Sequence, residues 1–157
     1  RKKKRVRVGA IKVDGSDLAL DELDLFLAKT RVFPTYAHRD RERVTPFLLA
    51  LERAGFQVLN DIDIPPGIPF KDAIERQVRE TAENGWVVAF VTSASITSPY
   101  VQAEIAMAQA LGGKFLAVVL DSTTVPANVD ATQVLDVTAS GPDGPRDLVE
   151  ELLVRRA

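Results

Sequence analysis

Two uninterrupted apolar runs constrain the fold of this 157-residue chain more than any other feature. Residues 86–91 are wholly apolar and residues 114–120 nearly so, and the segment between them has the apolar period of a helix. Short apolar runs of this kind are typical of strands buried on both faces of a parallel sheet. Two parallel strands need a long crossover between them, and the intervening helix supplies one.

The same alternation of strand and helix extends to both sides of this unit. Further strands are predicted at residues 31–36, 56–60 and, more weakly, 134–137. Helices are predicted at residues 41–54 and 70–85, a third begins at Pro99 within residues 98–112, and a last one carries Leu148, Val149, Leu152 and Leu153. Five strands alternating with helices predict an α/β fold with a parallel sheet covered on both faces.

Composition excludes several classes of protein. At 46% hydrophobic and 27% charged residues the chain is typical of one globular domain, without an apolar run long enough to span a bilayer. It contains no cysteine and one histidine, so we expect no disulfide, thiolate nucleophile or metal site, and a cytoplasmic location. A net charge of −2 gives no general attraction for nucleic acid.

Residues 1–30 are interpreted as an N-terminal extension, and residues 31–157 as the main domain. Residues 1–8 form a basic cluster that fits a nuclear address, a nucleic-acid contact or an anionic membrane surface. A solvated terminus is the simpler interpretation, because no basic or aromatic patch continues along the chain. The extension also contains a possible strand and a possible helix.

Glu104 is the only charged residue in residues 98–112. On a helical wheel the residues within about 60° of it are Tyr100, Val101, Met107, Ala108 and Leu111. A carboxylate in the middle of an apolar stripe is costly to bury without a partner. Glu104 is therefore either a functional group or one half of a buried ion pair, with Arg39 or Arg41 as its partner.

The ends of two predicted strands lie close to this helix. In open parallel sheets ligands bind at the carboxyl ends of the strands, where the strand order reverses. For an order of 2-1-3-4-5 that point lies between the first and third strands, which residues 36–38 and residues 92–95 follow. The helix bearing Glu104 starts just after the second segment, with Ser98 suited to the N-cap and Pro99 to the first turn.

Four segments of the chain match the motifs of one domain family. Residues 32–40, Val-Phe-Pro-Thr-Tyr-Ala-His-Arg-Asp, are similar to the family's first strand and turn. Residues 55–61 and 64–67 resemble its second strand and the following Pro-Pro-Gly loop. Residues 95–105 keep the spacing of its Ser-x-x-Ser-x-Trp-x-x-x-Glu segment. In these segments the chain resembles the Toll/interleukin-1 receptor (TIR) domain family, particularly its bacterial members.

The resemblance implies a flavodoxin-like three-layer fold and a chemistry. Many TIR domains cleave the nicotinamide–ribose bond of NAD+, releasing nicotinamide and ADP-ribose or a cyclic ADP-ribose product. The family's catalytic glutamate corresponds to Glu104, and substrate contacts are expected at Tyr36, Ala37, Asp61, Ser93 and Tyr100. NAD+ is the substrate, and no metal or other cofactor is implied. The implied partners are homotypic TIR domains, as a homo-oligomer or filament that activates the enzyme, and a companion sensor in defence or signalling.

The chain departs from the family pattern at three positions. Pro34 cannot donate a hydrogen bond within a central strand, so that strand is expected to be short or irregular. Thr35 stands where the family usually has serine, and Tyr100 where it has tryptophan. Tyr36 and Ser93 also have purely structural interpretations, as the end of a strand and a cap for backbone groups.

Other classes of function fit less well or remain open. A non-catalytic TIR signalling scaffold, which recruits partners through the Pro-Pro-Gly loop, stays an alternative. A phosphoacceptor receiver domain needs an acidic pair after the first strand and an aspartate after the third, and residues 36–38 and 92–93 supply neither. A dinucleotide redox domain is disfavoured because no Gly-x-Gly-x-x-Gly follows the first strand.

Overall fold

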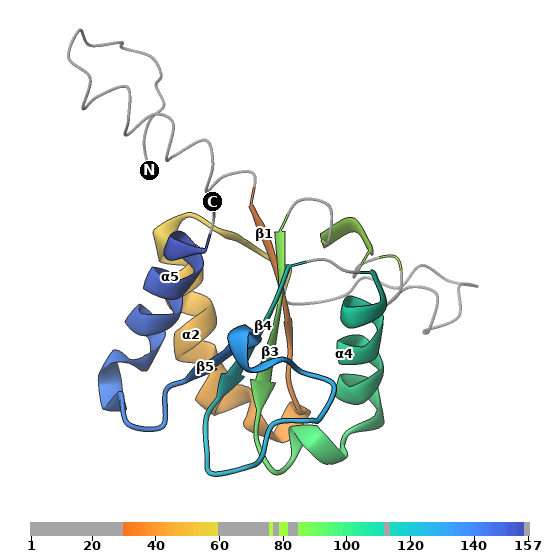
Figure 1. The fold of residues 1–157 in the computed structure, drawn as a ribbon. Helices are drawn as coiled ribbons and strands as arrows, with labels where there is room; N and C mark the ends of the chain where they lie inside the picture. Colours follow the sequence, from red (N-terminus) through yellow and green to blue (C-terminus); the bar gives the residue numbers. More distant parts are fainter. Residues whose placement is uncertain (1–29, 60–75, 77–78, 82–84, 112–113, 156–157) are drawn as a thin grey trace, which may run out of the picture.

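The computed structural model describes residues 30–59, 76, 79–81, 85–111 and 114–155. Within these ranges the strands form one parallel sheet in the order β2-β1-β3-β4-β5 (Figure 1). The strands are β1 (Arg31–Thr35), β2 (Gln57–Val58), β3 (Gly85–Val91), β4 (Lys114–Val119) and β5 (Val134–Asp136). The predicted α/β class and the order 2-1-3-4-5 are confirmed.

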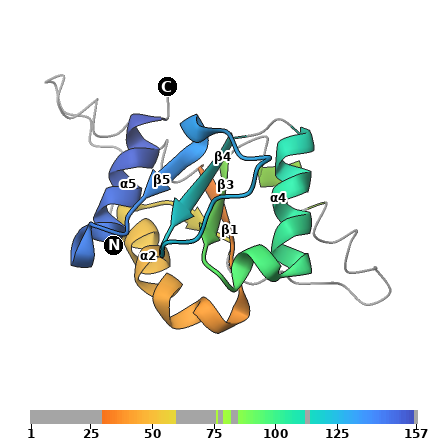
Figure 2. The same ribbon diagram turned by 60° about the horizontal axis from the view of Figure 1, so that its bottom comes forward.

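Helices cover both faces of the sheet. The long helices of the described residues are α2 (Arg41–Ala54), α4 (Pro99–Leu111) and α5 (Gly144–Val154). Figures 1 and 2 show α2 and α5 side by side on one face and α4 on the other. None of the helices in the described ranges is long and apolar enough to cross a membrane.

The two faces of the sheet bury separate apolar clusters, because successive residues of a strand point to opposite sides. The cluster under α2 and α5 includes Val32, Trp86, Val88, Phe90, Leu116, Val118, Val44, Leu51, Leu148 and Leu152. The cluster under α4 includes Phe33, Val87, Ala89, Val91, Phe115, Ala117, Val101, Ile105 and Ala108. All seven residues of β3 are buried, which confirms a strand covered on both faces.

Pro34 does not disturb β1. The register against β3 is continuous from Arg31 opposite Gly85 to Thr35 opposite Ala89. On the other side of β1, Leu59 N donates a hydrogen bond to Val32 O at 2.8 Å, so the backbone N–H and C=O of Val32 point toward β2. In a parallel strand every second residue points its backbone groups the same way, so those of Pro34 also point to the β2 side and not to β3. The described pairing of β1 with β2 ends at Val32. Pro34, which has no N–H to donate, therefore lies past the last paired residue and interrupts no hydrogen bond of this pairing.

Several predicted boundaries are corrected. The second strand is shorter than residues 56–60: the pairing covers Gln57 and Val58, and Asn60 lies outside the described residues. Gly85 begins β3 instead of ending the preceding helix. Of that helix, Arg76 and residues 79–81 are described and are helical. Residues 1–29 and the Pro-Pro-Gly loop lie outside the described residues.

The helix ends follow the predicted capping residues. Gly55 closes α2 in the left-handed conformation at φ 109°, and its N–H donates to carbonyls of the last turn. Ser98 caps α4: its Oγ accepts a hydrogen bond from Val101 N at 3.4 Å, and its carbonyl accepts from Gln102 N at 3.0 Å. These caps fix where α4 begins, and so where Glu104 lies along it.

Candidate functional site

Glu104 lies between α4 and the end of β1. Its residue is 8% exposed, and its Oε1 accepts a hydrogen bond from Thr35 Oγ1. Thr35 is the last residue of β1 and is itself 2% exposed. The carboxylate is therefore held against the sheet near the carboxyl end of the first strand, where the fold rule places a ligand site.

Glu104 lies within the face of α4 that packs on the sheet. Among the α4 residues whose burial is described, Val101, Glu104, Ile105 and Ala108 are buried, and half-buried Met107 packs against the same cluster. Tyr100, predicted to lie within the stripe, is 62% exposed. The period of the sequence identifies an apolar face but does not fix which edge of it meets the sheet.

Burial changes the chemistry of this carboxyl group. Loss of hydration raises the pKa of Glu104 from 4.5 to about 7, and the hydrogen bond from Thr35 partly opposes the rise. Arg39 and Arg41 are exposed, and neither forms an ion pair with Glu104. The buried ion pair considered as an alternative is therefore absent from the described residues. Near neutral pH the group is poised between its charged and neutral forms.

An open depression of about 560 Å³ lies at the carboxyl ends of β1 and β3. It is lined by Ala37, His38, Arg39, Ser93, Ala94, Thr97 and Ser98. The structure thus brings together two of the predicted substrate contacts, Ala37 and Ser93. Glu104 does not line this depression. The carboxylate and the depression are linked through the end of β1: Thr35, which bonds Glu104, lies two residues before Ala37, which lines the depression.

The remaining predicted contacts are placed apart from this pair. The ring of Tyr36 meets Phe90 edge-on at 6.5 Å between centroids, within the cluster under α2 and α5. It therefore lies on the face of the sheet opposite Glu104. Tyr100 stands exposed on the first turn of α4. Asp61 lies outside the described residues.

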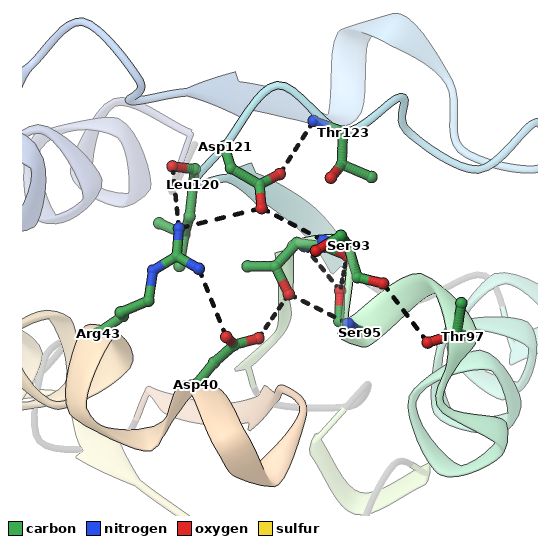
Figure 3. A network of polar contacts seen from close by, with 9 residues as sticks. Asp40, Arg43, Ser93, Ser95, Thr97, Leu120, Asp121 and Thr123 are labelled. Atoms are coloured by element: carbon green, nitrogen blue, oxygen red, sulfur yellow. Dashed lines mark hydrogen bonds and ion pairs between the residues drawn. The ribbon is translucent and has the colours of Figure 1, made fainter.

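A polar network beside the depression was not predicted from the sequence (Figure 3). Buried Asp40 accepts hydrogen bonds from Thr92 Oγ1 and from Arg43 Nη1, the latter at 3.5 Å. Thr92 and Ser95 in turn bond each other through backbone and side-chain groups. The network joins the turn after β1 to the loop before α4, so it holds the two walls of the depression in register.

Asp121 extends this network to the end of β4. Its carboxylate accepts hydrogen bonds from Thr123 N at 2.9 Å and Ser93 N at 3.2 Å, and Arg43 lies 4.0 Å from it. The hydrogen bond with Thr123, followed by the bond from Ser93 and the charge of Arg43, holds the pKa of Asp121 below its ordinary value. Ser93 is thereby fixed through its backbone and not through its hydroxyl.

Thr35 and Asp40 are the residues that sequence reasoning missed at this site. Thr35 carried a signal, since a hydroxyl in a buried strand needs a hydrogen-bond partner. Asp40 precedes α2 and has the residue type of an N-cap, but its side chain makes no cap hydrogen bond and reaches Thr92 instead. Within the described residues no group of three or more histidine, aspartate or glutamate side chains is arranged to hold a metal ion.

Comparison with known proteins agrees with the fold. The family model described as TIR domain matches residues 32–153, and this chain belongs to the TIR domain family. A search of curated proteins gives no significant match.

Solved structures resemble the chain in fold. The TIR domain of the Toll-related receptor TRR-2 from Hydra magnipapillata is similar with a TM-score of 0.60 and 21% identity, over 77% of this chain and 96% of that one. A fungal multi-domain GH3 β-N-acetylglucosaminidase with a GCN5-related glucosamine N-acetyltransferase region is similar with a TM-score of 0.52 and 14% identity. That likeness covers 80% of this chain and 14% of the fungal one.

Proposed function

We propose that this TIR domain is an NAD+ nucleosidase that cleaves the bond between nicotinamide and ribose. The observation that carries the proposal is the buried Glu104 carboxylate, which has a hydroxyl donor but no cationic partner among the described residues. A carboxylate kept in this state is costly, and perturbed carboxylates near the ligand end of a sheet are candidates for function. The family membership adds to the case.

The chemistry follows that of glycosidic bond cleavage. The bond from ribose C1′ to the pyridinium nitrogen breaks, and nicotinamide leaves as a neutral molecule with the bonding electron pair. C1′ becomes an oxocarbenium-like centre, which the Glu104 carboxylate stabilises from nearby. Attack by water gives ADP-ribose and releases one proton, whereas attack by a nitrogen of the adenine gives a cyclic product. The leaving group needs no acid, so one carboxylate suffices.

The substrate also favours the active form of the enzyme. Burial disfavours the ionised carboxylate in the free protein, but the positive charge of the nicotinamide ring stabilises it in the complex. Among the proposed contacts, Ala37 and Ser93 are supported by their shared depression. Ala37 would border the nucleotide, and Ser93 would line the floor of the cleft. Tyr36, Tyr100 and Asp61 stay proposals that rest on the resemblance alone.

The biological setting is proposed on the basis of the family. The domain would act in the cytoplasm in defence or signalling, with a companion sensor and with other TIR domains as partners. Self-assembly would raise its activity, as a homo-oligomer or filament. If the monomer hydrolyses NAD+ at full rate at every dilution, the dependence on assembly is wrong.

Nicotinamide release is the measurement that tests the proposed function. The protein is incubated with NAD+ at high concentration, and the products are separated by chromatography. We expect nicotinamide together with ADP-ribose or its cyclic form, and a loss of at least a hundredfold in rate for Glu104→Gln. Glu52→Gln, the same substitution at an exposed position of α2, is the matched control and should keep full activity. A protein that assembles with other TIR domains but releases no nicotinamide is a signalling scaffold.

A further inference from the structure

Thr35 is the described residue that holds the Glu104 carboxylate in place. Its side chain points to the α4 face of the sheet, like that of Phe33 two residues before it. Its Oγ1 donates to Glu104 Oε1, a contact between residues 69 positions apart in the chain. A threonine hydroxyl has a single proton to donate, so this bond uses its whole donor capacity.

The second oxygen of the carboxylate is left for another partner. No described residue donates a hydrogen bond to Glu104 Oε2. Glu104 is 8% exposed, and exposed Tyr100 lies one turn before it on the same side of α4. One oxygen is thus fixed against β1, while the other has no donor among the described residues.

No charged group in the described residues shares this environment. The described residues that face α4 from the central strands are Phe33, Thr35, Val87, Ala89, Val91, Phe115, Ala117 and Val119, and none of them titrates. On α4 itself the other titratable side chain of the described residues is the exposed Tyr100. Thr35 is therefore the group that opposes the cost of a charge on Glu104.

We propose that Thr35 is the positioning residue of the reaction: its hydroxyl holds Oε1 so that Oε2 faces the ribose, and it stabilises the ionised carboxylate. The inference rests on the proposed function, in which Glu104 stabilises the cationic ribose. Thr35 acts through Glu104 and not on the substrate. A methyl group in place of the hydroxyl would leave the shape of the core almost unchanged and remove the donor.

The test compares Thr35→Val with Thr35→Ser by two readouts. The first is the titration of the Glu104 carboxyl carbon followed by NMR in the free protein, and the second is the pH profile of kcat/KM for NAD+. In Thr35→Val the midpoint of both should rise by about one pH unit or more, because a hydrogen bond to the charged form is lost. At pH 7 the ionised fraction then falls from about a half to about a tenth, so kcat/KM drops about fivefold and recovers at higher pH.

Matched variants separate this role from a merely structural one. Thr35→Ser keeps the donor and should restore both midpoints. Thr92→Val removes the hydroxyl beside another buried carboxylate, that of Asp40, and should leave the Glu104 titration where it is in the wild type. If Thr35→Val does not fold, Thr35→Ala gives the same comparison with a smaller side chain.

The outcomes distinguish the inference from the proposed function. If Glu104→Gln abolishes activity but Thr35→Val keeps the wild-type midpoints of the Glu104 titration and of the kcat/KM profile, the role of Thr35 is overturned. The proposed nucleosidase function then stands. Activity that Glu104→Gln does not change would overturn the nucleosidase mechanism. The NMR titration still tests the contact between Thr35 and Glu104 in that case, because it needs no turnover.

Discussion

Replacement of Glu104 by glutamine should stabilise the fold at alkaline pH while it abolishes activity. Glutamine has nearly the shape of glutamate and keeps an oxygen that accepts the hydrogen bond from Thr35. It cannot ionise, so the variant avoids the cost of a buried charge. Stability and function are opposed at this position, as is common at active sites.

The magnitude follows from the pKa of Glu104. Its ordinary value is 4.5 and burial raises it to about 7, so the folded protein binds the proton more tightly than the unfolded chain. The free energy of unfolding therefore falls as the pH rises from about 4.5 to about 7, and the loss is complete above this window. At about 1.4 kcal/mol per pH unit the loss amounts to about 3 kcal/mol.

Urea unfolding of wild type and Glu104→Gln at pH 5 and pH 8 measures this loss. The difference in stability between the two proteins should change by about 2.5 kcal/mol in favour of the variant over this range, because a small part of the loss has already occurred at pH 5; the other titrating groups cancel. Glu52→Gln removes an exposed carboxylate and should show no such change. A difference for Glu104→Gln that stays flat between the two pH values would refute the claim that this carboxylate is buried without a counter-charge.

Two further substitutions, Gly85→Ala with Gly144→Ala as its control and Asp40→Ala, test the fold around the site by the same unfolding experiment. A Cβ at Gly85 would lie 1.9 Å from Arg31 O, so Gly85→Ala forces β1 and β3 apart and should lower the free energy of unfolding by at least about 2 kcal/mol. In Gly144→Ala the added methyl would approach no atom closer than 3.2 Å, so the loss of stability should be smaller. Asp40→Ala removes the buried acceptor of Thr92 Oγ1 and should cost about 2 kcal/mol. Equal stability of Gly85→Ala and wild type would contradict the strand register, and an unchanged Asp40→Ala would show that the network contributes nothing.

The fold could be predicted because its signals are local. The doubly buried run of β3, the glycine that ends α2 and the serine that caps α4 each act within a few residues. The shortness of β2 was not predictable in this way. Whether a strand continues depends on its neighbour, and β1 carries Pro34 beyond the described pairing.

The site was predictable only in part, because its contacts join distant residues. Glu104 was conspicuous as a charge on an apolar helix, but its partner Thr35 is 69 positions away, and 52 positions separate Asp40 from Thr92. Periodicity indicates which residues share a face and says nothing about which side chain that face meets. For the same reason the wheel placed Tyr100 in the stripe, whereas the packing leaves it exposed.

The most direct test of the account is to compare the titration of Glu104 with the pH dependence of the reaction in the same protein. The carboxyl carbon of Glu104 is followed by NMR in the free protein, and kcat/KM for NAD+ is measured over the same pH range, because that parameter reports the ionisations of the free enzyme. The structure predicts a common midpoint near pH 7, with activity rising as the carboxylate ionises. A carboxyl group that titrates near its ordinary value of 4.5, or a rate that does not follow its ionisation, would contradict the claim that buried Glu104 is the catalytic carboxylate.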